Sequence, residues 1–226
     1  MGSATCRHLA EQGWQVLAID RMSESLQSLC DDTPNVIPLV ADLADPGMTQ
    51  QVAEALQAMP PALGLVNMAG ISVGNTIDCL DDEAWEQSFA VNVTPAMRLI
   101  RLLTPGFKAH GGASVVNVGS PVGIVGARKP SYAASKAALQ GLTVSCARNL
   151  GASNIRVNLL LPGPTITKMT HDWSEERRAA IAEGSFLKRL CTPGEIARMV
   201  AFLLGPDASY LTGSTVDMTA GSMWGH

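Results

Sequence analysis

The stretch that decides the fold is residues 114–160, SVVNVGSPVGIVGARKPSYAASKAALQGLTVSCARNLGASNIRVNLL. Two short apolar runs, 114–118 and 155–160, stand on either side of a helical pattern at 131–149. Uninterrupted apolar runs of this length are typical of strands buried on both faces of a parallel sheet. Because parallel neighbours need a crossover connection, the stretch predicts a β-α-β unit.

The same alternation extends over the rest of the chain. Further strands are predicted at 14–19, 36–40, 63–67 and 214–216, and further helices at 4–12, 48–58, 83–109, 175–182 and 194–204. This order predicts one α/β domain, residues 1–226, with a doubly wound Rossmann-type parallel sheet and helices on both faces. The least regular segment, 164–193, is interpreted as a lid over the ligand crevice, or alternatively as a peripheral packing helix.

Composition excludes several classes of function. The chain of 226 residues has 16 basic and 20 acidic side chains and a net charge of -4, which argues against electrostatic binding of nucleic acid. Its five cysteines are widely spaced and predict reduced thiols in a cytoplasmic protein, and its four histidines have no metal-site spacing, so we expect no metal. The apolar runs are shorter than the roughly 20 residues of a membrane span, so we expect no membrane partner.

Tyr132 and Lys136 stand four residues apart at the start of a helical pattern, which places them on one helix face. A nearby ammonium favours the ionised form of a phenol and lowers its pKa, so this pair could transfer a proton near neutral pH. The alternative is a packed tyrosine ring beside an amine that reaches solvent.

Two further polar residues occupy positions that suggest a functional role. Ser120 follows the strand at 114–118 and is expected at the carboxyl edge of the sheet, where its hydroxyl could bind a carbonyl or alkoxide oxygen. Asn92 lies within a predicted helix, where asparagine is unfavourable. The alternatives are a turn-forming serine before Pro121 and a local kink of the helix.

These residues belong to a series of motifs in a fixed order. The series is Asp42-Leu43, Asn67-Met68-Ala69-Gly70, Asn92-Val93, Asn117-Val118-Gly119-Ser120, Tyr132-Ala133-Ala134-Ser135-Lys136 and Pro162-Gly163-Pro164-Thr165-Ile166-Thr167. With this series, over nearly its whole length, the sequence resembles the short-chain dehydrogenase/reductase family of the classical type.

The resemblance implies an NAD(P)-dependent oxidoreductase that interconverts a secondary alcohol and a ketone. In this reading Tyr132 is the general acid in reduction and the base in oxidation, and Ser120 positions the substrate oxygen. Lys136 lowers the pKa of the tyrosine and binds the nicotinamide ribose, and Asn92 holds a water in a proton relay. The substrate is expected to be a small-molecule alcohol or ketone.

The resemblance also assigns residues to cofactor binding. They are Gly2, Asp20, Asp42, Leu43, Asn67, Ala69, Gly70, Tyr132, Lys136, Pro162, Gly163, Thr165 and Thr167. A carboxylate at Asp20 would repel the 2′-phosphate of NADP, so NAD is favoured. Arg21 could pair with that phosphate, which keeps NADP as the alternative.

One departure concerns the start of the chain. The family has a turn resembling T-G-x-x-x-G-x-G after its first strand, whereas this sequence begins Met1-Gly2-Ser3 and has only the last glycine. We expect that the first strand and most of the turn are missing, that the natural chain starts upstream of Met1, and that a gap of roughly 10 Å interrupts the sheet. A second hypothesis is therefore a non-catalytic binding or assembly module of this fold.

Partners and substrate are inferred from exposed and apolar positions. The predicted helices 83–109 and 131–149 have more apolar residues than one sheet face needs, which predicts a homo-oligomer, a dimer or tetramer. Candidate pocket residues suggest a mainly apolar substrate site; they are Ser72, Val73, Val122, Met169, Trp173 and Trp224.

Overall fold

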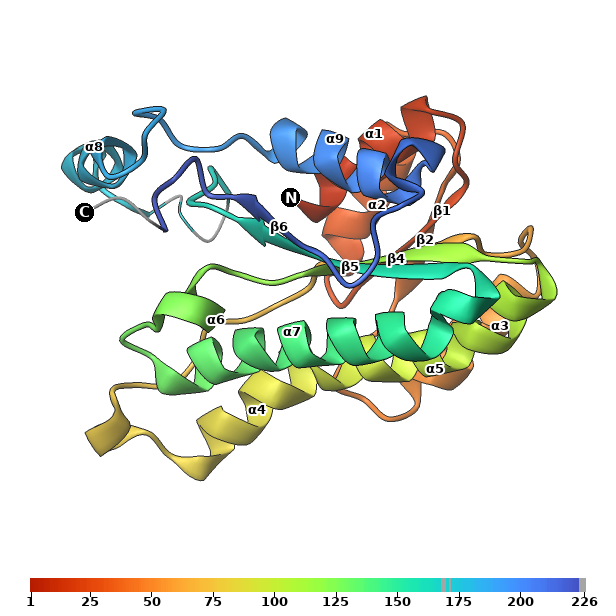
Figure 1. Ribbon diagram of the computed structural model, residues 1–226, viewed down its shortest axis with the longest axis horizontal. Coiled ribbons are helices and arrows are strands. Elements are labelled where there is room, and N and C mark those ends of the chain that lie inside the picture. Colours follow the sequence, from red (N-terminus) through yellow and green to blue (C-terminus); the bar gives the residue numbers. More distant parts are fainter. Residues whose placement is uncertain (168–169, 171, 224–226) are drawn as a thin grey trace.

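The computed structural model describes residues 1–167, 170 and 172–223, and it has parallel strands with helices on both faces (Figure 1). One sheet pairs β1 with β2, and a second has the order β3-β4-β5-β6. The strands are β1 (Val16–Asp20), β2 (Val36–Val40), β3 (Gly64–Asn67), β4 (Ala113–Val118), β5 (Ile155–Pro162) and β6 (Thr215–Met218). The predicted Rossmann-like α/β class is confirmed.

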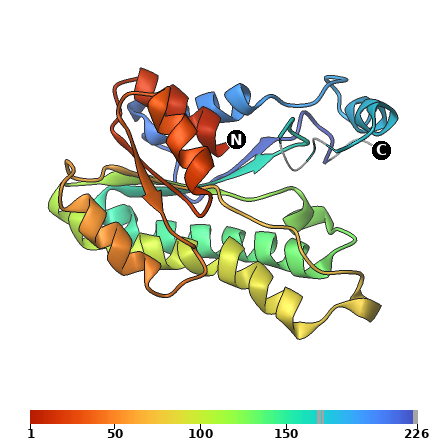
Figure 2. The same cartoon turned by 180° about the vertical axis from the view of Figure 1, so that it is seen from behind.

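Each face of the sheets has its own helices (Figures 1 and 2). One face carries α1 (Gly2–Glu11), α2 (Ser23–Asp31) and α9 (Pro193–Leu204). The other carries α3 (Met48–Leu56), α5 (Thr94–Ala109) and α7 (Pro130–Leu150), with α4 (Asp82–Asn92) beside α7. The other helical elements are η1 (Ile77–Cys79), α6 (Val122–Val125), η2 (Gly151–Ser153), α8 (Glu175–Glu183) and η4 (Pro206–Ala208).

The two central strands are buried on both faces, as their apolar runs predict. Val116 and Val118 of β4 pack in the cluster that includes Ile196 of α9. Val115, which directly precedes Val116, packs instead with Ile100 of α5. Successive side chains of a strand point to opposite faces, so one apolar strand contributes to both cores.

The expected single sheet is divided into two. Among the described residues, hydrogen bonds join β3 to β4 but not to β1. All four residues of β3 are only half-buried, whereas in β4 only Ala113 is. The two sheets are connected by apolar packing, because Leu17, Leu39 and Leu65, from β1, β2 and β3, share a cluster with Met48 and Leu99.

The structure corrects two helix predictions. The helix expected over 83–109 is two helices, which meet at Val93 with φ -124° and ψ -54°. Pro95 in the first turn of α5 explains the break, since proline lacks an N–H and its ring clashes with the carbonyl four residues earlier. Helix α2, which the sequence analysis did not predict, is short and buries only two residues, Leu26 and Leu29, too few for a clear helical period.

The segment predicted as a lid carries α8, which projects beyond the end of β6 in Figure 1. The structure describes α8 in full, and none of its residues is buried. Both interpretations of this segment, the lid and the peripheral packing helix, stay predictions. Within the described ranges, no helix is long and apolar enough to cross a membrane.

Candidate active site

The structure brings Ser120, Tyr132 and Lys136 together at the carboxyl edge of β4. Ser120 lies two residues past the end of β4, and the first two turns of α7 carry the other two side chains. The Lys136 ammonium donates a hydrogen bond of 3.0 Å to the Val118 carbonyl and lies 5.9 Å from the centre of the Tyr132 ring. The predicted spacing therefore produces a cluster rather than a solvent-exposed amine.

The electrostatics of this cluster differ from the expectation. Burial raises the pKa of the Tyr132 phenol, and a hydrogen bond with the Ser120 side chain partly opposes that rise. Lys136 is only 5% exposed, and desolvation lowers the pKa of its ammonium to about 8. Because the loss of hydration disfavours both charged forms, desolvation decides the direction of both pKa shifts in the protein by itself, and the lowering of the phenol's pKa by the Lys136 charge stays a prediction.

Asn92 ends α4 and connects the cluster to a neighbouring loop. Its Oδ1 accepts a hydrogen bond of 2.8 Å from the Ile71 N–H, and its Nδ2 donates to the Ile71 carbonyl at 3.0 Å. The same Nδ2 donates to Ser135 Oγ at 2.9 Å, and Ser135 in turn donates to the Tyr132 carbonyl at 2.8 Å. The unfavourable asparagine thus ends a helix and joins the loop to α7.

Candidate cofactor residues end strands of both sheets. Asp20 ends β1, Asn67 ends β3 and Pro162 ends β5. The exposed Asp20 carboxylate accepts a hydrogen bond of 3.0 Å from the Met22 N–H, which fixes its position beyond the strand. The structure therefore places Asn67 and Pro162 at the carboxyl edge of the four-stranded sheet, and Asp20 at the carboxyl end of a strand of the two-stranded sheet.

The remaining cofactor candidates differ in exposure. Asp42 is exposed, and its carboxylate caps the turn at Ala44, whereas Leu43 packs into the cluster around Met48. Ala69 is exposed, and Gly2 begins α1. Leu43 therefore has a core role in addition to any contact with a cofactor.

The segment after β5 is held tightly. Thr165 is buried, and its hydroxyl donates to the Gly163 carbonyl at 2.8 Å. The Thr167 N–H donates to Thr170 Oγ1 at 2.9 Å, and the Cys191 N–H donates to the Pro164 carbonyl, also at 2.9 Å. The half-buried Trp173 lies under the Arg177 guanidinium, whereas Met169 and Trp224 lie outside the described residues.

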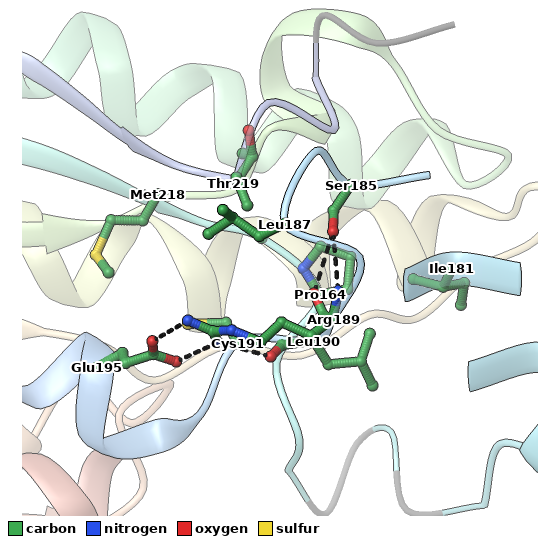
Figure 3. Close-up of a pocket in the computed structure, with 12 residues that line it drawn as sticks. Pro164, Ile181, Ser185, Leu187, Arg189, Leu190, Cys191, Glu195, Met218 and Thr219 are labelled. Atoms are coloured by element: carbon green, nitrogen blue, oxygen red, sulfur yellow. Dashed lines mark hydrogen bonds and ion pairs between the residues drawn. The ribbon is translucent and has the colours of Figure 1, made fainter. Parts of the chain in front are cut away.

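A cavity of about 160 Å³ lies beside this segment (Figure 3). Figure 3 shows the Arg189–Glu195 ion pair on one side of it and Ile181 of α8 on another. Its lining includes Gly163, so it adjoins the cofactor segment rather than the Tyr132 cluster. Hydrogen bonds from Arg189 and Thr192 hold the pKa of Glu195 well below its usual range.

A chain of hydrogen-bonded polar side chains, which the sequence patterns did not predict, lies next to the site. Asn67 Nδ2 donates to Asn117 Oδ1 at 2.8 Å, and Asn117 Nδ2 donates to Thr143 Oγ1 at 2.9 Å. This chain connects β3, β4 and α7 below the site. An asparagine in a strand expected to be buried is the signal that could have revealed it, since buried amides need partners.

The residues fit a nicotinamide dinucleotide at its ribose end. An ammonium has three N–H donors, and the bond to Val118 uses one of those of Lys136, so the others can meet ribose hydroxyls. Gly70 is a place of close approach, because a Cβ there would lie 3.2 Å from Lys136 Nζ and 3.3 Å from Asn92 Oδ1. A ligand can therefore approach the backbone where a side chain has little room.

Comparisons with known proteins show the family of the chain. The family model described as "Enoyl-(Acyl carrier protein) reductase" matches residues 1–222. The 3-oxoacyl-[acyl-carrier-protein] reductase FabG of Vibrio cholerae is 32% identical over 227 residues, which cover 98% of this chain and 92% of the relative. An uncharacterized short-chain type dehydrogenase/reductase of Sinorhizobium fredii is 33% identical over 236 residues, covering 99% and 92%.

A solved structure is also similar. The L-sorbose reductase of Gluconobacter frateurii, complexed with NADPH and L-sorbose, superposes with a TM-score of 0.90 and 28% identity, covering 99% of this chain and 92% of that one. The chain belongs to the short-chain dehydrogenase/reductase family. It is an NAD(P)-dependent oxidoreductase that interconverts an alcohol and a ketone, and the hypothesis of a non-catalytic module is not favoured.

Proposed function

We propose that Tyr132 is the acid and base of the reaction and that Ser120 holds the reacting oxygen. The observation that carries this proposal is the Ser120–Tyr132 hydrogen bond beside the buried Lys136. When bound, the nicotinamide supplies the hydride. In reduction, the Tyr132 hydroxyl donates its proton to the ketone oxygen, and the Ser120 hydroxyl donates a second hydrogen bond to the same atom.

Lys136 and Asn92 support this proton transfer. With a pKa of about 8, the Lys136 ammonium is mostly protonated at neutral pH, and its charge stabilises the phenolate that remains after proton donation. Its other N–H groups orient the ribose hydroxyls. Asn92, buried next to Gly70, keeps the backbone of Ile71 in place and holds a water that returns the proton.

Isotope transfer tests the proposed chemistry directly. With a ketone and NAD(P)H deuterated at the hydride position, we expect deuterium on the carbinol carbon of the product and an equal loss of reduced cofactor absorbance. Product without deuterium, or consumption of cofactor without an alcohol product, would contradict hydride transfer to a ketone.

We further propose that the chain prefers NAD to NADP. The support is the exposed Asp20 carboxylate, which would accept hydrogen bonds from the adenine ribose and repel a 2′-phosphate. The neighbouring Arg21 and the NADPH in the L-sorbose reductase complex favour the opposite preference. The charge at Asp20 therefore decides between the two cofactors.

The Asp20→Asn substitution tests the effect of this charge on cofactor preference. The wild type is expected to have the higher kcat/KM with NADH, and the variant is expected to lower the NADH-to-NADPH ratio by at least about tenfold, the effect of losing one charged hydrogen bond. Asp45→Asn is the matched control, because Asp45 is exposed in the loop after β2 and caps only its own turn. A wild type that prefers NADPH, or a ratio unchanged in Asp20→Asn, would refute the proposal.

For the substrate, we propose a ketone with an apolar chain, of the 3-oxoacyl thioester class. Val73 and Val122 are half-buried next to the catalytic segments, and Ile124 and Val125 of α6 are 45% and 60% exposed. Apolar side chains there favour an acyl chain over a polyol. We expect a higher kcat/KM with a 3-oxoacyl thioester than with L-sorbose; a preference for the ketose would reverse this assignment.

We also propose that the protein is a homo-oligomer that pairs through α4, α5 and α7. Trp85 of α4 and Val144 of α7 are 40% and 48% exposed, as an interface between helices requires. Light scattering is expected to give a mass at least twice the 23.7 kDa of one chain. A monomer at micromolar concentration would refute this proposal.

A further inference from the structure

The loop that follows Gly70 is attached to the start of α7 by two side chains. Lys129 Nζ donates to the Ser72 carbonyl at 3.0 Å, and Ser131 Oγ donates to the Val73 carbonyl, also at 3.0 Å. These are consecutive carbonyls of one loop, and the donors come from a segment more than fifty residues away in sequence. Ser72 and Val73 are candidate pocket residues, so the contacts hold a segment that we expect to form one wall of the substrate site.

The two donors stand next to the proposed acid in the chain. Pro130 begins α7, which makes Lys129 the N-cap residue and puts Ser131 in the first turn, directly before Tyr132. Ser131 is fully buried, and Lys129 is half-buried. The turn of helix that carries the phenol therefore also holds the loop.

The loop lies closely against Ser131. Gly74 has φ +87°, and a Cβ on it would come within 2.8 Å of Ser131 Oγ and 2.9 Å of a Leu80 methyl group. At the other end of the loop, the Asn92 side chain forms hydrogen bonds with both the N–H and the carbonyl of Ile71. Residues 71–74 are thus held one after another against Asn92 and the start of α7.

We propose that Lys129 and Ser131 are positioning residues that set the distance between loop 71–74 and the Tyr132 hydroxyl, and thereby determine which ketones fit. This inference rests on the proposed role of Tyr132. Because their partners are carbonyls of loop 71–74, the two side chains position this loop and take no direct part in the proton transfer from Tyr132. Loss of either donor frees one carbonyl and lets the wall move.

Lys129→Met removes one attachment at a half-exposed position where folding is not at risk. We expect the KM for the ketone to rise about three- to tenfold, the effect of one lost hydrogen bond, while kcat at saturation and the KM for NAD(P)H change less than about twofold. Lys129→Arg, which keeps a donor, should restore most of the affinity. Arg128→Met is the matched control, because Arg128 is an exposed cation one residue earlier.

Equal effects of Arg128→Met and Lys129→Met would overturn the inference, since they would indicate attraction of an anionic substrate rather than positioning. A change confined to kcat or to the KM for NAD(P)H would also overturn it. Selectivity gives a further check: the ratio of kcat/KM between a short and a long ketone is expected to change in Lys129→Met and in Ser131→Ala, but not in the control.

Hydrogen exchange supplies a readout that does not depend on turnover. Peptides covering 71–80 are expected to exchange faster in Ser131→Ala and Lys129→Met than in the wild type, with unchanged exchange in the strands. If exchange of this segment is unchanged in both variants, the attachment does not hold the loop and the inference fails. If instead Tyr132→Phe keeps full turnover, the proposed acid is wrong, whereas the exchange result still reports on the loop.

Discussion

Tyr132→Phe is expected to reduce kcat for ketone reduction about 10³-fold while the protein stays folded. The substitution removes only the phenol oxygen, the group that donates the proton, and loss of a general acid costs about 10²- to 10⁴-fold in rate. The ring stays in place at the start of α7, so packing is preserved. The measurement is steady-state reduction of a ketone that the wild type accepts, with NADH and NADPH each tested.

Tyr210→Phe is a matched control for this prediction. The chain has two tyrosines, and Tyr210 is fully exposed in the segment before β6. Its variant should keep wild-type kcat and the same unfolding midpoint. If Tyr132→Phe and Tyr210→Phe have equal activity, Tyr132 has no part in the proton transfer. If Tyr132→Phe binds NAD(P)H as tightly as the wild type, loss of turnover reflects chemistry rather than cofactor binding.

Lys136→Met is expected to abolish most turnover and yet to stabilise the fold at pH 7. The wild-type ammonium is 5% exposed, and its one hydrogen bond within the described residues goes to the Val118 carbonyl. A buried charge without a carboxylate partner lowers stability, and methionine fills a similar volume without charge. We expect at least about a 100-fold loss of kcat and a higher free energy of unfolding in urea.

The stability gained by Lys136→Met is expected to depend on pH. Desolvation lowers the pKa of Lys136 from 10.5 to about 8 in the folded state. Between these values the unfolded chain binds more protons than the native one, so this residue makes the wild-type free energy of unfolding increase as pH rises from 8 to 10.5. Lys136→Met lacks this increase, so its advantage, at most about 3 kcal/mol, should shrink across that window. An advantage that grows with pH would contradict the assigned burial.

The sequence contains most of the information about the class of fold because that information is local. Apolar runs at 114–118 and 155–160 around a helical pattern predict buried parallel strands, and the structure has β4 and β5 there. The four-residue spacing of Tyr132 and Lys136 likewise predicts a shared helix face. The break at Val93 was missed, because the long apolar pattern concealed the effect of Pro95.

What the sequence by itself determined is the order of the strands, the edge at which Ser120, Tyr132 and Lys136 meet, and the family. Only the tertiary structure decided the sign of the Tyr132 pKa shift, the separation into two sheets and the attachment of loop 71–74 by Lys129 and Ser131. Periodicity and spacing act between residues a few positions apart. Desolvation and hydrogen bonds act through space, between segments that meet only when the chain has folded.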